Sequence, residues 1–195
     1  RHEGPLGEGV EAETAEGVNR MMSWMKAGTV ASICLTAGWA VAQESTNRVS
    51  ENTDWSVFAE PAEGPKECWG VSAPKETVNT RDGRVVAVRR SDILLFVTYR
   101  PETGGSPEVS FTGGYPFADG STVSLQVGDS NFELFTEGEF AWPAPEDDPK
   151  IVDAMKRGAE AVLTARSSRG TQTKDMFSLL GFTAAQEDAA KRCSG

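Results

Sequence analysis

The sequence has 195 residues, of which 38% are hydrophobic and 25% charged, a composition typical of a folded domain and not of a disordered tail. Its formal net charge of −10 argues against nucleic acid and anionic lipid as main partners, because binding to phosphates requires clustered lysine and arginine. The single histidine is His2, so the rest of the chain lacks the Ser-His-Asp and Cys-His arrangements and the commonest zinc sites.

The N-terminal region resembles an export segment preceded by an unrelated extension. We expect residues 1–24 to be a non-native upstream extension without order, and residues 25–42 to be a signal peptide. This peptide has a basic start at Lys26, an apolar run, and the small residues Ala40 and Ala42 before Gln43. We therefore predict cleavage after Ala42 and a periplasmic, secreted or cell-envelope location. An uncleaved anchor is the alternative, but the run is shorter than the roughly 20 residues that span a bilayer.

Cysteine content is informative once the signal peptide is removed. Residues 43–195 keep a net charge of −8, since the first 42 residues hold three basic and five acidic side chains. Cys34 leaves with the signal, and Cys68 and Cys193 remain. Two cysteines in an exported domain indicate one disulfide, Cys68 to Cys193. Two free buried thiols and an intermolecular bridge are the alternatives.

Residues 55–195 are expected to form the folded domain, behind a polar, flexible leader at residues 43–54. Short alternating or apolar segments predict strands at residues 55–60, 68–72, 85–88, 93–99, 108–112, 122–127, 131–136, 161–165 and 171–179. The pair Asp82-Gly83 is typical of a tight hairpin turn. The continuous apolar run at 93–99 predicts a central strand that is covered on both faces.

Two segments predict helices. The first has Asp148 as its N-cap and ends near Gly158. The second is C-terminal, with Thr183 and Gln186 as a capping box. Its inward face is predicted to carry Phe182, Ala185, Ala189 and Cys193. About eight strands with two short helices, one before the penultimate strand and one C-terminal, predict an all-β protein of the β-sandwich type.

No pattern predicts a catalytic residue, a cofactor site or a metal site. Ser72-Ala-Pro-Lys75 has the Ser-x-x-Lys spacing of penicillin-binding enzymes, but Pro74 breaks the helix that this spacing requires. The acidic run 146–148 is explained by the preference of helix starts for carboxylates, although a divalent cation is the alternative ligand. The basic residues near the hairpin are either a solvated strand face or a contact for an acidic partner, and they are Arg81, Arg84, Arg89 and Arg90.

Three aromatic residues lie in segments predicted to be loops: Tyr115, Phe117 and Trp142. Core packing is the default for such side chains. If they stay exposed together, they form a contact patch for a partner, because apolar groups in loops are harder to bury.

Several of these features together resemble the invasion-associated locus B family of alphaproteobacteria. They are the export signal, the early Trp55 strand, the Glu-Cys-Trp69 segment, and above all Phe177-Ser-Leu-Leu-Gly-Phe-Thr-Ala-Ala185. The resemblance covers residues 55–193. It implies an immunoglobulin-like β-sandwich in the cell envelope, a link to host-cell entry, and no transferable catalytic residues.

The sequence therefore predicts an exported, non-enzymatic envelope protein that binds another macromolecule, with a role in invasion or adhesion by analogy to the family. The partner is expected to be a protein or another envelope component, with no nucleic acid, no cofactor, and no membrane span after signal cleavage. The alternative is a periplasmic module for binding a small ligand or for envelope assembly. The sequence does not indicate an oligomeric state.

Overall fold

The computed structural model describes residues 47–194, which contain twelve strands and two α-helices. The strands are β1 (Arg48–Asn52), β2 (Trp55–Glu60), β3 (Glu67–Ser72), β4 (Glu76–Arg81), β5 (Arg84–Val85), β6 (Leu94–Tyr99), β7 (Pro107–Thr112), β8 (Thr122–Val127), β9 (Ser130–Glu137), β10 (Phe140–Pro143), β11 (Glu160–Arg166) and β12 (Gln172–Ser178). The helices are α1 (Asp148–Arg157) and α2 (Phe182–Cys193). The predicted signal peptide and upstream extension lie outside the described residues.

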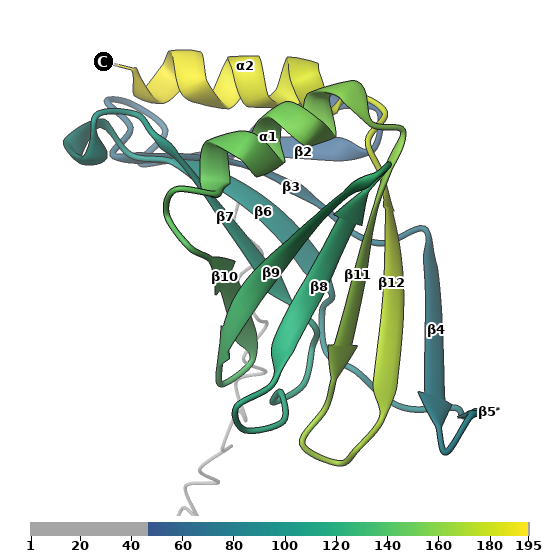
Figure 1. The fold of residues 1–195 in the computed structure, drawn as a ribbon. Helices are drawn as coiled ribbons and strands as arrows, with labels where there is room; N and C mark the ends of the chain where they lie inside the picture. Colours follow the sequence, from purple (N-terminus) through teal and green to yellow (C-terminus); the bar gives the residue numbers. More distant parts are fainter. Residues whose placement is uncertain (1–46, 195) are drawn as a thin grey trace, which may run out of the picture. The chain divides into compact units, whose positions relative to one another are not determined.

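All twelve strands belong to one sheet, in the order β1-β2-β3-β6-β7-β10-β9-β8-β11-β12-β4-β5, and every neighbouring pair is antiparallel. The sheet folds over, so that β6 and β7 pass behind β8 and β9, while β2 lies behind α1 (Figure 1). Across this fold Phe111 of β7 packs edge to face on Phe177 of β12, with 6.1 Å between ring centroids. The predicted all-β class is confirmed, whereas the predicted strand count of about eight was too low.

The strand that the sequence analysis missed at the N-terminal side is β1. It lies inside the segment expected to be a flexible leader, but it pairs with β2 through Asn52 opposite Trp55 and Arg48 opposite Phe58. Its side chains are half-buried or exposed, so it carries no apolar alternation that would reveal it. The hairpin between β4 and β5 was predicted correctly, since both Asp82 and Gly83 have the positive φ of a tight turn.

Helix α2 is held by the motif that is most specific to the family resemblance. Gly181 adopts φ +86° directly against Asn52, where a Cβ atom would lie 1.9 Å from the Asn52 carbonyl oxygen. Phe182 packs edge to face on Trp55 at 4.8 Å, and the Trp55 indole donates a hydrogen bond to the Ser178 carbonyl oxygen at 2.9 Å. The motif therefore joins the end of β12 to the start of the sheet.

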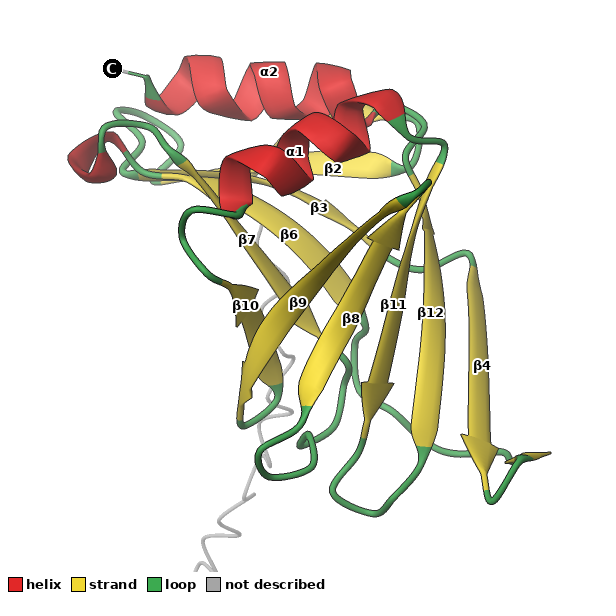
Figure 2. Ribbon diagram, viewed as in Figure 1, coloured by secondary structure: helices red, strands yellow, loops and turns green. Residues whose placement is uncertain are grey.

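The start of α2 differs from the prediction. The helix begins at Phe182 with Gly181 as its N-cap, and no side-chain cap is formed. Gln186 is buried against Gly70 of β3, so it does not complete a capping box with Thr183. The inward face was predicted correctly, because all four residues named for it are fully buried. Both helices lie at the same end of the sheet (Figure 2).

The sulfur atoms of Cys68 and Cys193 form a disulfide between β3 and the last turn of α2, with 5.8 Å between the Cα atoms. Both cysteines are fully buried. The bond closes a loop over a sequence separation of 125 residues, so it joins the beginning of the domain to its end.

Helix α1 places a carboxylate in the core. Asp147, not Asp148, is the N-cap, and Pro149 lies in the first turn. The Asp148 side chain accepts a hydrogen bond from the backbone N–H of Val109 at 2.7 Å. Burial, together with the nearby carboxylates of Glu108 and Asp147, raises the pKa of Asp148 to about 6.

We expect Asp148 to make folding stability depend on pH. A carboxyl group with a raised pKa in the folded state stabilises the fold most below its unfolded pKa, and this contribution is lost as pH rises through about 6. Relative to an Asp148→Asn variant, the protein should therefore lose on the order of 2 to 3 kcal/mol of unfolding free energy between pH 4 and 7. Urea denaturation across this range measures the difference. Asp153→Asn, which removes an exposed carboxylate from the same helix, is the matched control for the loss of one negative charge.

Candidate functional site

A buried ion pair joins β12 to the segment that precedes β6. The Arg90 guanidinium donates two hydrogen bonds to the Asp175 carboxylate, at 2.7 and 2.6 Å, and the two side chains are 6% and 0% exposed. Arg90 also donates to the Gly113 carbonyl oxygen at 2.8 Å and to the Asn79 side-chain oxygen at 3.3 Å. Burial raises the pKa of Asp175, and the hydrogen bonds from Arg90 oppose that shift.

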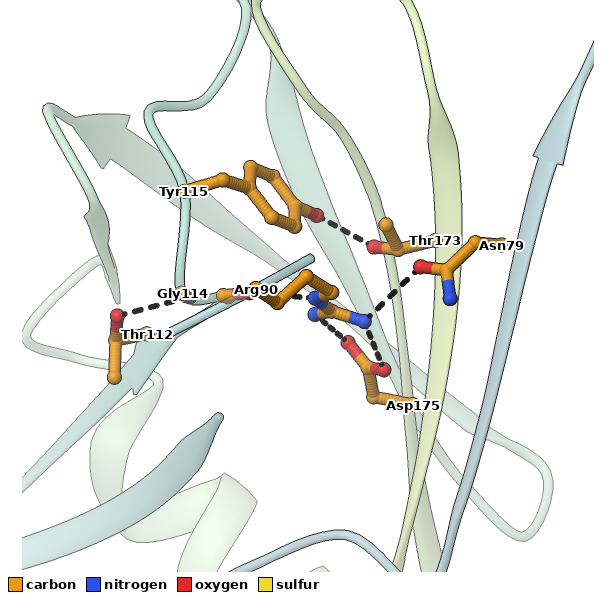
Figure 3. A network of polar contacts seen from close by, with 8 residues as sticks. Asn79, Arg90, Thr112, Gly114, Tyr115, Thr173 and Asp175 are labelled. Carbon is orange, nitrogen blue, oxygen red and sulfur yellow. Dashed lines mark hydrogen bonds and ion pairs between the residues drawn. The ribbon is translucent and has the colours of Figure 1, made fainter. Parts of the chain in front are cut away.

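Tyr115 closes one side of this network (Figure 3). The Arg90 guanidinium lies 4.9 Å from the centre of the Tyr115 ring, and the tyrosine hydroxyl is 2.5 Å from that of Thr173. Burial raises the pKa of Tyr115. The network joins β4, β12, the segment before β6 and the loop after β7, so its first role is to hold four separate parts of the chain together.

The basic residues grouped by the sequence analysis do not act as one surface. Arg90 is buried and paired, while Arg81 donates to the Thr171 hydroxyl at 2.7 Å. Arg84 and Arg89 are exposed. The interpretation of all four as one solvated strand face was therefore wrong for Arg90.

The three aromatic residues predicted as a contact patch have different surroundings. Phe117 is only 5% exposed and packs between Phe111 and Tyr115, with centroid distances of 6.1 and 5.2 Å. Tyr115 is half-buried in the network around Arg90. Trp142 is also half-buried, on β10, where it stacks on Phe140 at 5.7 Å. The three rings therefore do not stay exposed together, and Phe117 follows the default expectation of core packing.

A larger set of aromatic side chains lies on the outer face of the sheet. Inward residues such as Val57, Val97 and Ala141 are fully buried, and the aromatic residues alternate with them along their strands. Phe135 and Phe140 are 55% and 40% exposed. We call this set the aromatic face, and it consists of Phe58, Trp69, Phe96, Phe135, Phe140 and Trp142.

The aromatic face contains two cross-strand pairs of rings, which are separated in the sheet by β6 and by β7, whose residue opposite Phe96 is Ser110. Phe58 of β2 is the direct cross-strand partner of Trp69 of β3, and their rings stack at 5.5 Å. Trp142 of β10 is the cross-strand partner of Phe135 of β9. Phe96 of β6 lies between the two pairs, which corrects the prediction that residues 93–99 are covered on both faces.

Glutamates surround these rings on the same face of the sheet. They are Glu60, Glu67, Glu108, Glu133 and Glu137. Each lies two residues from an outward-facing side chain of its own strand, and so faces the same side of the sheet. Arg100 pairs with Glu67 at 2.5 Å and Glu108 at 3.0 Å, and so neutralises part of this charge. This side of the sheet therefore has apolar side chains at its centre and an acidic border.

The patterns considered for catalysis and metal binding have structural explanations. Ser72 donates to the Asp54 carbonyl oxygen at 2.7 Å, and Lys75 pairs with the Asp54 carboxylate at 2.5 Å. That ion pair lowers the pKa of Asp54. Asp148 is bonded to Val109 and Asp147 to Lys150. Within residues 47–194 no three His, Cys, Asp or Glu side chains converge as metal ligands, and neither helix there is long and apolar enough to cross a bilayer.

Comparison with known proteins supports the fold and gives the family. A search of curated proteins finds no match. One similar solved structure is the crystal structure of invasion associated protein B from Bartonella henselae, with a TM-score of 0.51 and 18% identity over 73% of this chain and 95% of that chain. At this identity the likeness supports the fold alone. The model of the invasion associated locus B (IalB) family matches residues 55–190, most of the described domain, and the chain therefore belongs to that family.

Proposed function

We propose that this protein is exported to the periplasm or the outside of the cell and acts there, without catalysis, by binding another protein. The observation that carries the proposal is the aromatic face. It places six aromatic side chains on one surface of the sheet, of which Phe135 and Phe140 are the most exposed, and exposed apolar groups gathered on one surface mark interaction sites. In the part of the chain that the structure describes, these rings are not members of the buried core cluster.

The border of the aromatic face specifies the kind of partner. Its five glutamates, with Arg100 as the bridging cation, favour a surface of apolar side chains surrounded by lysine and arginine. A second copy of this chain would bring two acidic borders together in a protein whose residues 43–195 already have a net charge of −8. The occupant we propose is therefore a different protein with a basic border. A part in host-cell entry follows only by analogy with the family name.

The export step has its own expected outcome. In an alphaproteobacterial host that produces the full chain, the protein should be recovered from the periplasmic or extracellular fraction with Gln43 as its first residue, since Ala40 and Ala42 precede the predicted cleavage site. Intact mass and N-terminal sequencing measure this. Recovery of the uncleaved chain from the cytoplasm would contradict export.

Binding through the aromatic face is tested by photo-crosslinking in intact cells. A photoreactive amino acid at Phe135, the most exposed ring of the face, should give a discrete protein adduct, whereas one at Leu180, which is 63% exposed elsewhere, should not. The adduct is identified by mass spectrometry, and affinity for the purified partner is then measured. Phe135→Ser with Phe140→Ser should weaken it by about 100-fold, since each buried aromatic contributes about 1.5 to 3 kcal/mol.

Other results would contradict this assignment. Equal adducts at both positions would show non-specific contact, and no adduct at either would remove the basis for a binding face. An adduct with a second copy of the chain would replace the heterologous partner by a homodimer. The alternative function, a small-ligand module, requires a pocket, and the cavity beside Arg90 is the observation that favours it.

A further inference from the structure

A cavity of about 700 Å³ lies beside the buried ion pair and is separate from the aromatic face. Its walls are the segment 86–90, the loop that carries Gly114, Tyr115 and Pro116, and the turn between β11 and β12. The volume lies within the range of small-molecule sites in proteins, which is roughly 300 to 1,000 Å³. We propose that this cavity binds a small ligand that carries two or more negatively charged oxyanion groups, either phosphates or carboxylates. The proposal is independent of the aromatic face.

The charge of the cavity is opposite to that of the protein. Four arginines line it and only one carboxylate does, Glu139. Arg90 is already neutralised by Asp175. The other three arginines are Arg81, Arg89 and Arg169. None of them forms an ion pair with any carboxylate of residues 47–194. Three uncompensated guanidinium groups around one cavity repel one another, and a bound polyanion would relieve that repulsion.

Three of the side chains that line the cavity are held in place by contacts within the protein. The bidentate pair with Asp175 holds Arg90 in place, and Tyr115 is held by its hydrogen bond to Thr173 and by the guanidinium over its ring. Arg81 is oriented by its hydrogen bond to the Thr171 hydroxyl at 2.7 Å. A site whose walls are already ordered loses less conformational entropy when it binds.

The other lining residues limit the ligand class. Ser168, which is exposed and lines the cavity with the arginines, has a hydroxyl that suits acceptor oxygens, whereas the Ser167 and Thr173 hydroxyls are bonded to Thr171 and Tyr115. Val86, Val88 and Pro116 add apolar surface, so the ligand should also contain a short carbon skeleton. A guanidinium pairs equally well with a carboxylate and a phosphate, so the lining of this cavity suits both groups.

Calorimetric titration of the purified mature protein at low ionic strength tests the proposal, with citrate and glucose 1,6-bisphosphate as probes. We expect saturable binding of at least one probe. Arg89→Ala with Arg169→Ala should weaken it by about tenfold or more, since the variant removes two charged hydrogen-bond donors from the cavity. Both side chains are exposed, so the variant should fold, and circular dichroism confirms that.

The control variant is Arg84→Ala with Arg157→Ala, which removes the same charge from exposed positions that do not line the cavity. It should bind within about twofold of the unmodified protein. Equal weakening by both variants would show general charge attraction and overturn the proposal, as would no binding of either probe. Binding of citrate alone assigns the site to polycarboxylates, and binding of the bisphosphate alone assigns it to phosphate esters.

Discussion

Replacing Asp175 by alanine is expected to lower the free energy of unfolding by about 3 to 5 kcal/mol, because the Arg90 charge would remain buried without a partner. The Arg90 side chain is 6% exposed, so water cannot replace the two hydrogen bonds that the carboxylate accepts. Urea denaturation at pH 7, followed by circular dichroism, measures the loss.

Two variants make this result specific to the buried pair. Arg90→Met with Asp175→Leu removes both charges and should cost much less than Asp175→Ala alone, because no unpaired ion is left. Glu51→Ala breaks the exposed pair with Arg48, at 3.4 Å, and should change stability by less than about 1 kcal/mol. If Asp175→Ala costs no more than Glu51→Ala, the pair does not stabilise the fold.

The sequence was sufficient where a local pattern determines a structure. The turn at Asp82-Gly83 requires positive φ at two adjacent residues, and both have it. The inward face of α2 follows from helical spacing, and the link from Cys68 to Cys193 follows from having two cysteines in the expected mature domain. None of these three predictions depends on knowing which strands are neighbours in the sheet.

The missing strands lie where burial is low or the composition is unusual. β1 begins the sheet order, and β4 is followed there only by the two-residue strand β5, so β1 and β4 carry polar residues with little alternation. Backbone hydrogen bonds at the edge of the sheet specify such strands, and these leave no trace in a single sequence. The strand predicted at residues 85–88 is β5, which is shorter and ends at Val85. β10 contains Pro143 and follows a short turn, so the sequence analysis assigned it to a connection.

The candidate sites required the three-dimensional structure. Arg90 and Asp175 are 85 residues apart, and nothing local connects them. Alternation assigns Phe58 and Trp69 to the side opposite the core, but it does not show that β9 and β10 continue the same surface. Phe117 and Phe140 have similar surroundings in the sequence, yet one is buried and the other is 40% exposed. The sequence signal for the aromatic face was that several strands have an aromatic residue at an outward-facing position.

The disulfide should contribute more to stability than any other single bond of the domain. In the chain-entropy model, a cross-link over 125 residues restricts the unfolded chain enough to stabilise the fold by about 4 to 5 kcal/mol. Reduction of the unmodified protein should therefore lower its urea midpoint strongly. Before reduction, neither thiol should react with an alkylating reagent in urea.

Comparing the reduced protein with a double alanine variant separates two contributions to stability, that of the disulfide bond and that of the packed cysteine side chains. Cys68 and Cys193 are fully buried, so Cys68→Ala with Cys193→Ala removes both the bond and core volume. The reduced protein keeps the side chains and loses only the bond. It should lie between the oxidised protein and the double variant in stability, closer to the variant. Equal stability of the oxidised and reduced forms would mean that the closed loop does not restrict the unfolded chain, and the sheet and α2 would then hold the two ends together by packing alone.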